Sequence, residues 1–402
     1  MKIGPDSNAT RSKFFGDAEC DLRSFRIQGA LCAAHFTDIF PRGFELLSDL
    51  KSKKISFNDI PRNEQSAITI LNNFLTELRR GQHVECLKKI KKIPGRTKEK
   101  ISETKVAVVL AEHLLCRLSP GQAYILDARS KQKESSGCHG AEIHFGETGI
   151  GHELVWHGFL DIVLQSPVCG NIPDTTVTTV SEELITTPKK RMRIEENIDS
   201  EEEASSSPGG KCISEEKISL YSNNVENQSV SQAIVFSLLQ QSRHPELKHF
   251  LIPNIVISAS HFRVIMYDAK NDVLLRSQLL PLSLDDSIND DGGVENENIL
   301  SPVAIVYLWM VLHYKIFCSG IDIDALEQNL DDIKAGFPDV ASSRWDIYSH
   351  SLKSGVGSFP LVKKDGVPSE DSYMLTKSIF KRKQNHEECF ATKKHLDGDA
   401  MT

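Results

Sequence analysis

The sequence predicts an α/β protein of the α+β kind, with a helical N-terminal region and disordered inserts. Apolar residues recur at three- and four-residue spacing before residue 120, a pattern typical of helices. From residue 143 onward, runs rich in strand-forming residues alternate with helical patterns. The chain has 402 residues, of which 40% are hydrophobic and 25% charged. A chain of this length and composition can bury a full core without disulfide bonds.

We expect three regions along the chain. Residues 1–100 form a helical N-terminal region with a basic segment, residues 101–350 form the α/β core, and residues 351–402 form a polar, flexible tail. Two polar stretches interrupt the core. Residues 168–211 are rich in threonine, then charged, then rich in Ser, Pro and Gly, which predicts a disordered insert. Residues 281–299 carry six acids and no basic residue, which predicts an acidic loop.

Two helices are predicted in the first third of the chain. Residues 62–80 place four apolar side chains on one helical face, and residues 102–118 repeat the pattern before Ser119-Pro120-Gly121 ends it. The residues on the first face are Ile68, Leu71, Leu75 and Leu78.

The core is expected to alternate strands and helices. Residues 152–164 read as a hairpin or a bent strand, and residues 229–242 as a helix. Two strands are expected at residues 255–259 and 261–267. Pro302 then begins a helix that is apolar nearly all round and is therefore expected to be buried.

Cysteine usage and hydropathy indicate which cellular compartment the protein occupies. None of the nine cysteines forms a C-x-x-C pair, and their spacing is irregular, which favours a reduced, intracellular setting. The first 20 residues lack the apolar stretch of a secretory signal. No apolar run reaches 18 residues, so the sequence favours neither a secreted nor a membrane protein.

Charge is strongly segregated along the chain. The formal net charge is −8, yet residues 79–105 carry ten Lys or Arg against three Glu. This stretch is able to contact phosphates, although a solvated helix face would look the same. The acids concentrate in residues 181–203 and 281–299, so the net charge does not argue against a nucleic-acid partner.

Asp161 is the first candidate site residue. In a strand over residues 159–164, both faces would be apolar and the strand would be central. An ionised aspartate there is costly unless it is paired, hydrogen-bonded or metal-bound, which makes Asp161 a functional candidate. The alternative is an aspartate at a strand end that is solvated or bonded to backbone.

Further candidates follow the predicted insert. If residues 213–221 form a strand, Glu215 and Lys217 share one face, where Glu215 could join Asp161 around a divalent metal and Lys217 could orient a water. Alternatively, these residues form the solvated end of the insert. Gln232 lies at the expected start of a helix and could bond a phosphate or a base edge, unless it simply faces solvent.

With these residues at these places, residues 102–267 resemble the PD-(D/E)XK, or restriction-endonuclease-like, nuclease superfamily, whose core is an αβββαβ unit. The resemblance implies metal-dependent phosphodiester hydrolysis with Mg²⁺, in DNA processing or mobile-element biology. It also implies roles for single residues. Asp161 and Glu215 would bind the metal, Lys217 would assist catalysis, Gln232 would contact nucleic acid, and Glu112, with Glu153 as a rival, would be an accessory metal ligand.

Two other features of the sequence suggest partners. The exposed cluster Lys189, Lys190, Arg191 and Arg193 has the form of a nuclear-import peptide read by an import carrier, which predicts a nuclear protein; a mixed-charge linker is the alternative. Cys138, His139, His144, His152 and His157 lie close together, but without standard zinc spacing, and scattered histidines are the favoured interpretation.

The sequence leaves a second function open. The chain could be a nuclease fold that has lost activity, or an unrelated nuclear binding protein. The sequence does not indicate whether the nucleic acid is DNA or RNA, and it does not predict an oligomeric state.

Overall fold

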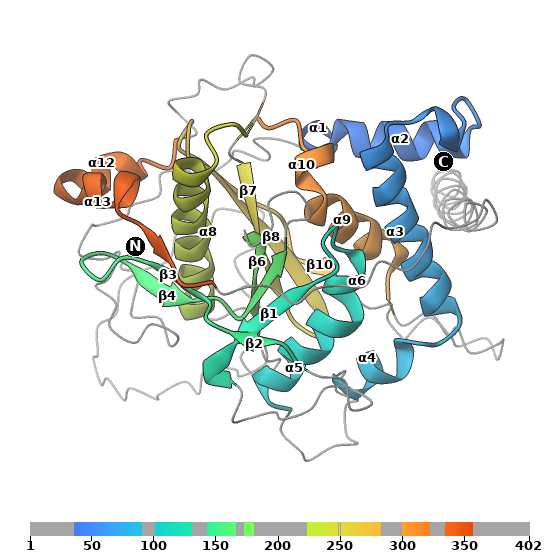
Figure 1. Ribbon diagram of the computed structural model, residues 1–402, viewed down its shortest axis with the longest axis horizontal. Coiled ribbons are helices and arrows are strands. Elements are labelled where there is room, and N and C mark those ends of the chain that lie inside the picture. The colour runs from blue at the N-terminus through green and yellow to red at the C-terminus, as the bar shows by residue number, and fades with distance from the viewer. Residues whose placement is uncertain are drawn as a thin grey trace, which may run out of the picture.

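A mixed β-sheet lies between two helical layers. The computed structural model describes residues 36–90, 101–130, 143–165, 173–180, 223–247, 249, 251–282, 300–321 and 334–356. Helix α8 (Asn223–Arg243) covers one face of the sheet, whereas α5 (Glu103–Leu110), α6 (Cys116–Leu118) and α9 (Pro302–Leu312) lie on the other (Figure 1). The described part is therefore a mixed α/β structure, as the sequence predicts.

The large sheet contains eight described strands in the order β10-β8-β7-β6-β5-β1-β2, with β9 paired to β8. β1 and β5 are antiparallel, β5 and β6 are antiparallel, and β6 and β7 are parallel. Strands β1, β6 and β7 therefore run in the same direction and end at one edge, which we call the carboxyl edge. The strands are β1 (Tyr124–Asp127), β2 (Phe145–Gly146), β5 (Ile162–Gln165), β6 (Pro173–Thr179), β7 (Leu251–Ile257), β8 (His261–Asp268), β9 (Val273–Arg276) and β10 (Leu280–Pro281).

A second, three-stranded sheet packs beside the first. Strands β3 (Gly149–Gly151), β4 (His157–Phe159) and β11 (Lys353–Ser354) form it in the order β11-β3-β4. The backbone amide of Trp156 donates to the Tyr348 hydroxyl at 3.2 Å, which ties this sheet to α13 (Trp345–His350). The short helix α12 (Phe337–Ala341) precedes α13.

The N-terminal helices belong to the same hydrophobic core as the sheet. They are α1 (Phe36–Ile39), α2 (Pro41–Lys51), α3 (Arg62–Arg79) and α4 (Val84–Ile90). The sequence predicted α3, and its apolar residues Ile68, Leu71 and Leu75 are buried. The indole nitrogen of Trp309 in α9 donates to the Ala67 carbonyl at 2.8 Å, so α3 is fixed to the buried helix beneath it.

The helix predicted over residues 102–118 is present with one irregularity. Ser102 caps it by accepting from the Lys105 amide at 3.2 Å. Between α5 and α6 the chain forms one turn of π-helix, Ala111–Leu115, which we call the π-turn. Such turns are rare and occur frequently at functional sites.

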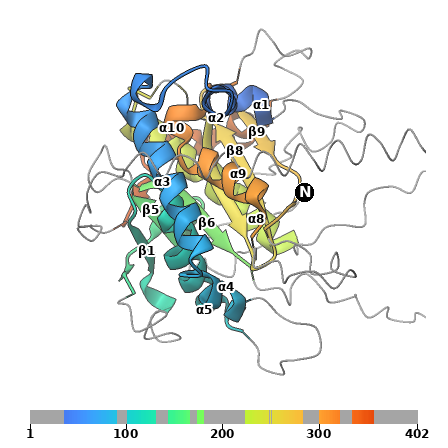
Figure 2. The ribbon, with the colours of Figure 1, turned by 90° about the vertical axis from the view of Figure 1, so that its right-hand side faces the viewer.

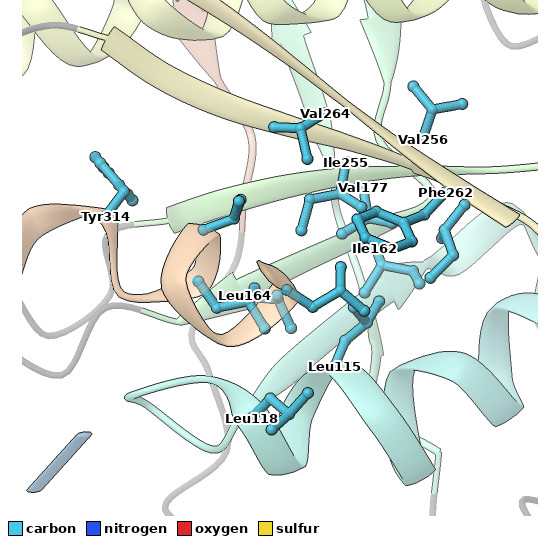
Figure 3. Close-up of a cluster of buried hydrophobic side chains, with 14 of the residues drawn as sticks. Leu115, Leu118, Ile162, Leu164, Val177, Ile255, Val256, Phe262, Val264 and Tyr314 are labelled. Atoms are coloured by element: carbon cyan, nitrogen blue, oxygen red, sulfur yellow. The ribbon is translucent and has the colours of Figure 1, made fainter. Parts of the chain in front are cut away.

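One row of apolar side chains explains how this helix holds the sheet. Ile162, Val177, Ile255 and Val264 are neighbours in register across β5, β6, β7 and β8. They are buried, and Leu115 and Leu118 lie against this cluster (Figure 3). Burying each such side chain contributes about 1.5–3 kcal/mol.

The strand pattern around residue 161 differs from the prediction. Residues 159–164 do not form one strand, because β4 ends at Phe159 in the small sheet and β5 begins at Ile162 in the large one. The expected disordered insert is also wrong in part, because residues 173–179 form β6.

Other predictions have mixed outcomes. Helix α8 begins at Asn223 rather than near residue 229. The strands β7 and β8 and the buried α9, capped by Ser301, are confirmed, and α10 (Tyr314–Phe317) follows α9. None of the described helices is long and apolar enough to cross a membrane.

Candidate functional site

Polar residues gather at the carboxyl edge of the sheet. Asp127 ends β1, Thr178 and Thr179 end β6, and Asp161 directly precedes β5. The Asp127 amide donates to the Asp161 carbonyl at 3.3 Å, so the two aspartates are adjacent across β1 and β5. Ligands of open α/β sheets commonly bind at such an edge, which makes it the place to test the predicted site.

Asp161 is hydrogen-bonded to the neighbouring strand. Its Oδ2 accepts from the Thr179 amide at 2.8 Å and from the Thr179 hydroxyl at 3.3 Å. The residue therefore matches the alternative interpretation of the sequence, an aspartate at a strand end bonded to backbone. A carboxylate held by such donors does not need a metal to be stable there.

Asp127 is the second acid of the edge, and Arg129 neutralises it. The guanidinium places Nη2 2.8 Å and Nε 3.0 Å from Oδ2, and the Arg129 amide donates to Oδ1 at 3.0 Å. The same guanidinium lies 3.3 Å from the ring centroid of Phe159. Arg129 thus combines an ion pair with a cation–π contact, which fixes its orientation.

Gln232 connects α8 to three strands. The residue is 0% exposed, and its Oε1 accepts from the Thr178 hydroxyl and from Asn254 Nδ2 at 3.4 Å. Its Nε2 donates to the Phe159 carbonyl at 3.2 Å. Gln232 lies within the helix rather than at its start, so a contact with nucleic acid would require the side chain to leave this network.

Ion pairs at the beginning of α8 attach that helix to β8 and β9, at the end of the sheet away from β1 and β2. Glu226 in the first turn forms ion pairs with Arg276 of β9 and with Arg263 of β8, the latter at 3.7 Å. Burial lowers the pKa of Arg276 from its ordinary value. These contacts fix where α8 starts relative to the carboxyl edge.

The predicted accessory ligand, Glu112, faces a histidine. Glu112 is in the π-turn, where its Oε2 is 3.7 Å from Nε2 of His113. Nδ1 of His113 in turn lies 3.1 Å from Nδ1 of His83. The rival candidate Glu153 lies in an exposed turn between β3 and β4.

The remaining predicted site residues lie outside the described residues. These are Glu215 and Lys217 with the strand expected over residues 213–221, and the import peptide Lys189, Lys190, Arg191 and Arg193. Of the proposed histidine and cysteine cluster, Cys138 and His139 also lie outside them.

The residues around Asp161 offer few ligands for Mg²⁺. The β6 residues beside it, Val177, Thr178 and Thr179, supply neither a carboxylate nor a lysine. Across the described ranges, no three His, Cys, Asp or Glu side chains come together as a metal site. The described residues alone therefore do not fit the metal that the resemblance implies, and no catalytic step follows from them.

A basic surface covers one end of the helical layer. The C-terminal end of α3 lies near α4 and α5 there (Figures 1 and 2). Six exposed cations in this part, which we call the basic surface, are Arg79, Arg80, Lys88, Lys89, Lys105 and Arg117. The exposed acids among them are Glu85 and Glu103. The described cations of the basic segment, Arg79, Arg80, Lys88, Lys89 and Lys105, are thus exposed, and residues 91–100 lie outside the described residues.

Comparisons with protein-family models, with curated proteins and with solved structures find no match to this chain.

Sequence reasoning missed several residues of these clusters. Asp127 ends a strand of four residues and Arg129 follows it, and such a strand is too short to stand out by periodicity. His83 and His113 are 30 residues apart, and nothing in the sequence joins them. The run of β-branched residues at 175–180 was the available signal for β6.

Proposed function

We propose that the protein is a nuclease-like nucleic-acid-binding protein, with a restriction-endonuclease-like core that binds the phosphodiester backbone without hydrolysing it. The order of elements carries the proposal. The α5–α6 helix, β1, β5, β6, α8 and β7 follow one another in αβββαβ order, with β2 to β4 inserted, and Asp161 stands at the start of the second core strand.

Two observations favour binding over hydrolysis. The third core strand has threonines beside Asp161, where the family pattern has an acid and a lysine. The other carboxylate of the edge, Asp127, is engaged by Arg129. The basic surface supplies the attraction for phosphates, because each neutralised phosphate releases counterions.

Metal-dependent hydrolysis is the second candidate function, and the position of Glu215 and Lys217 in the chain favours it. Lys217 precedes Asn223 by six residues, and α8 begins at the carboxyl edge. A chain extends at most about 3.5 Å per residue, so Lys217 is within about 21 Å of the helix start.

One assay separates the two candidates. End-labelled DNA and RNA are incubated with the full chain and Mg²⁺, and both binding and cleavage are followed for the wild type, Asp161→Asn and Glu215→Gln. The proposal expects equal binding by all three proteins and no cleavage. Cleavage by the wild type that both variants lose would establish hydrolysis instead. Asp346→Asn, an exposed acid in α13, is the matched control. Absence of binding by the wild type would refute both candidates.

A further inference from the structure

Four titratable side chains form a continuous line through the helical layer. Glu77 Oε2 lies 2.9 Å from His83 Nε2, and His83 Nδ1 lies 3.1 Å from His113 Nδ1. His113 Nε2 lies 3.7 Å from Glu112 Oε2. We call these residues the carboxylate–histidine line. Both histidine side chains are 7% exposed, so solvent contributes little to their hydrogen bonding.

The line joins two parts of the fold. Glu77 is in the last turns of α3, and His83 directly precedes α4. Glu112 and His113 lie in the π-turn of the helix that packs on the sheet. The Phe74 ring stacks on His83 with centroids 5.9 Å apart. Whatever changes the bond between the two histidines therefore acts on the attachment of the α3–α4 turn to the core.

Counting protons along the line shows that its two ends conflict when both imidazoles are neutral. A carboxylate only accepts, so His83 donates from Nε2 to Glu77. The pKa of Glu77 is lowered chiefly by this hydrogen bond, which keeps the carboxylate ionised. If His83 is neutral, the proton between the two Nδ1 atoms belongs to His113. Nε2 of His113 then turns a lone pair toward Glu112.

One additional proton removes the conflict. It places a hydrogen on Nε2 of His113, directed toward Glu112, while Nδ1 of His113 still donates to Nδ1 of His83. The pair then carries a single positive charge between two carboxylates, and all three contacts of the line become attractive.

We propose that the carboxylate–histidine line is a proton-linked clasp, which takes up one proton and in that state fastens the α3–α4 turn to the α5–α6 helix. Because the closed clasp binds more protons than the open one, opening becomes easier as the pH rises. Its effect on nucleic acid rests on the proposed function, since α4 carries Lys88 and Lys89 of the basic surface.

Neighbouring charged groups determine how readily the carboxylate–histidine line takes up the added proton. Arg80 and Arg117 act on Glu77 and favour its ionised form. The two carboxylates attract the added proton, whereas these arginines repel it. On α4, Glu85 pairs with Lys88 at 3.4 Å on the exposed side. Cys116 of α6 stays a neutral thiol, because burial raises its pKa to about 12.

Hydrogen exchange of the full chain tests the clasp without nucleic acid. Protection of the amides of residues 62–90, corrected for intrinsic exchange, is compared at about pH 6 and about pH 8, on either side of the ordinary imidazole range. We expect about a tenfold loss of protection at the higher pH in the wild type. His113→Gln, which has no titratable ring, should lose this pH dependence.

Controls keep the test decisive. His350→Gln, which alters an exposed histidine paired with Asp346 at 3.2 Å, should respond to pH as the wild type does. If His113→Gln does not fold, Glu112→Gln serves instead, because an amide both donates and accepts and so accommodates either tautomer.

Three results would overturn the clasp. One is a pH-independent wild type, and another is a pH response retained in the variant that folds. The third is stoichiometric zinc in the wild type that is lost in the variant. The failure of nucleic-acid binding would refute the proposed function and leave the exchange result standing.

Discussion

At the carboxyl edge, Asp161 and Asp127 accept hydrogen bonds from donors that keep their protons, namely the Thr179 amide and the Arg129 guanidinium. In the helical layer, Glu77 and Glu112 face imidazoles instead. The first arrangement is fixed over the physiological pH range, and the second responds to protons. The difference separates a rigid edge from an adjustable attachment.

The rigidity of the edge depends most on Gln232. Replacing Gln232 by Ala leaves the Thr178 hydroxyl and the Phe159 carbonyl without this buried partner. It also removes one of the two acceptors of Asn254 Nδ2, which keeps its contact with the Ser229 carbonyl at 3.4 Å. We expect a loss of about 4 kcal/mol of unfolding free energy, because each unsatisfied group costs about 1–3 kcal/mol. Urea denaturation measures it, with the exposed Gln82→Ala as control. A Gln232 that contacts nucleic acid would instead alter binding and leave stability unchanged.

The stability that depends on the buried His313 should change with pH in the opposite direction to that of the carboxylate–histidine line. His313 donates from Nδ1 to the Trp309 carbonyl, and burial lowers its pKa from 6.5 to about 4. Because the unfolded chain binds this proton more readily, acid favours unfolding as the pH falls below 6.5. Relative to His313→Gln, the wild type should lose up to about 3 kcal/mol by about pH 4.

Equal pH profiles of unfolding free energy for these two proteins would contradict the assignment of a buried, neutral His313. His350→Gln, which changes an exposed histidine, is the matched control and should follow the wild-type profile.

Asp161 tests whether the edge is structural. Asp161→Ala removes the acceptor of the Thr179 amide and should cost about 2 kcal/mol. Asp161→Asn retains an acceptor oxygen and should cost less than about 1 kcal/mol. Thermal denaturation compares the two. A gain in stability on removing the carboxylate would indicate an acid held in an unfavourable position for catalysis.

The smallest stability effect is expected at the basic surface. Lys88→Glu combined with Lys89→Glu changes two exposed side chains and should alter unfolding free energy by less than about 0.5 kcal/mol. A larger loss in denaturation experiments would mean that these lysines support the fold and not a binding surface.

Parts of the fold were predictable because their local sequence shows a recognisable pattern of apolar or strand-forming residues. Helix α3 shows its apolar face directly, and α9 is apolar all round with Pro302 at its start. Strands β7 and β8 are long runs of strand-forming residues between turns. Local sequence determines such elements, so no tertiary information was needed.

Other parts were not predictable, for physical reasons. The threonines of β6 look polar, yet Thr176, Thr178 and Thr179 are buried, because their β-branched stems suit a strand inside the sheet and Thr178 bonds Gln232 of α8. The sequence singles out Asp161 as an unusual acid, but its partner Thr179 comes from a strand that the sequence hides. The His83–His113 contact depends on tertiary packing and leaves no local pattern.

The central claim, binding of nucleic acid through the basic surface, is tested most directly by the salt dependence of affinity for a short duplex. The slope of log K against log salt is negative, and each phosphate contact contributes about 0.9 to its magnitude. The account predicts that Lys88→Glu with Lys89→Glu reduces this magnitude by about two. The exposed pair Lys53→Glu and Lys54→Glu is the matched control and should keep the wild-type slope. An unchanged slope in the Lys88 and Lys89 variant, at wild-type affinity, would contradict the account.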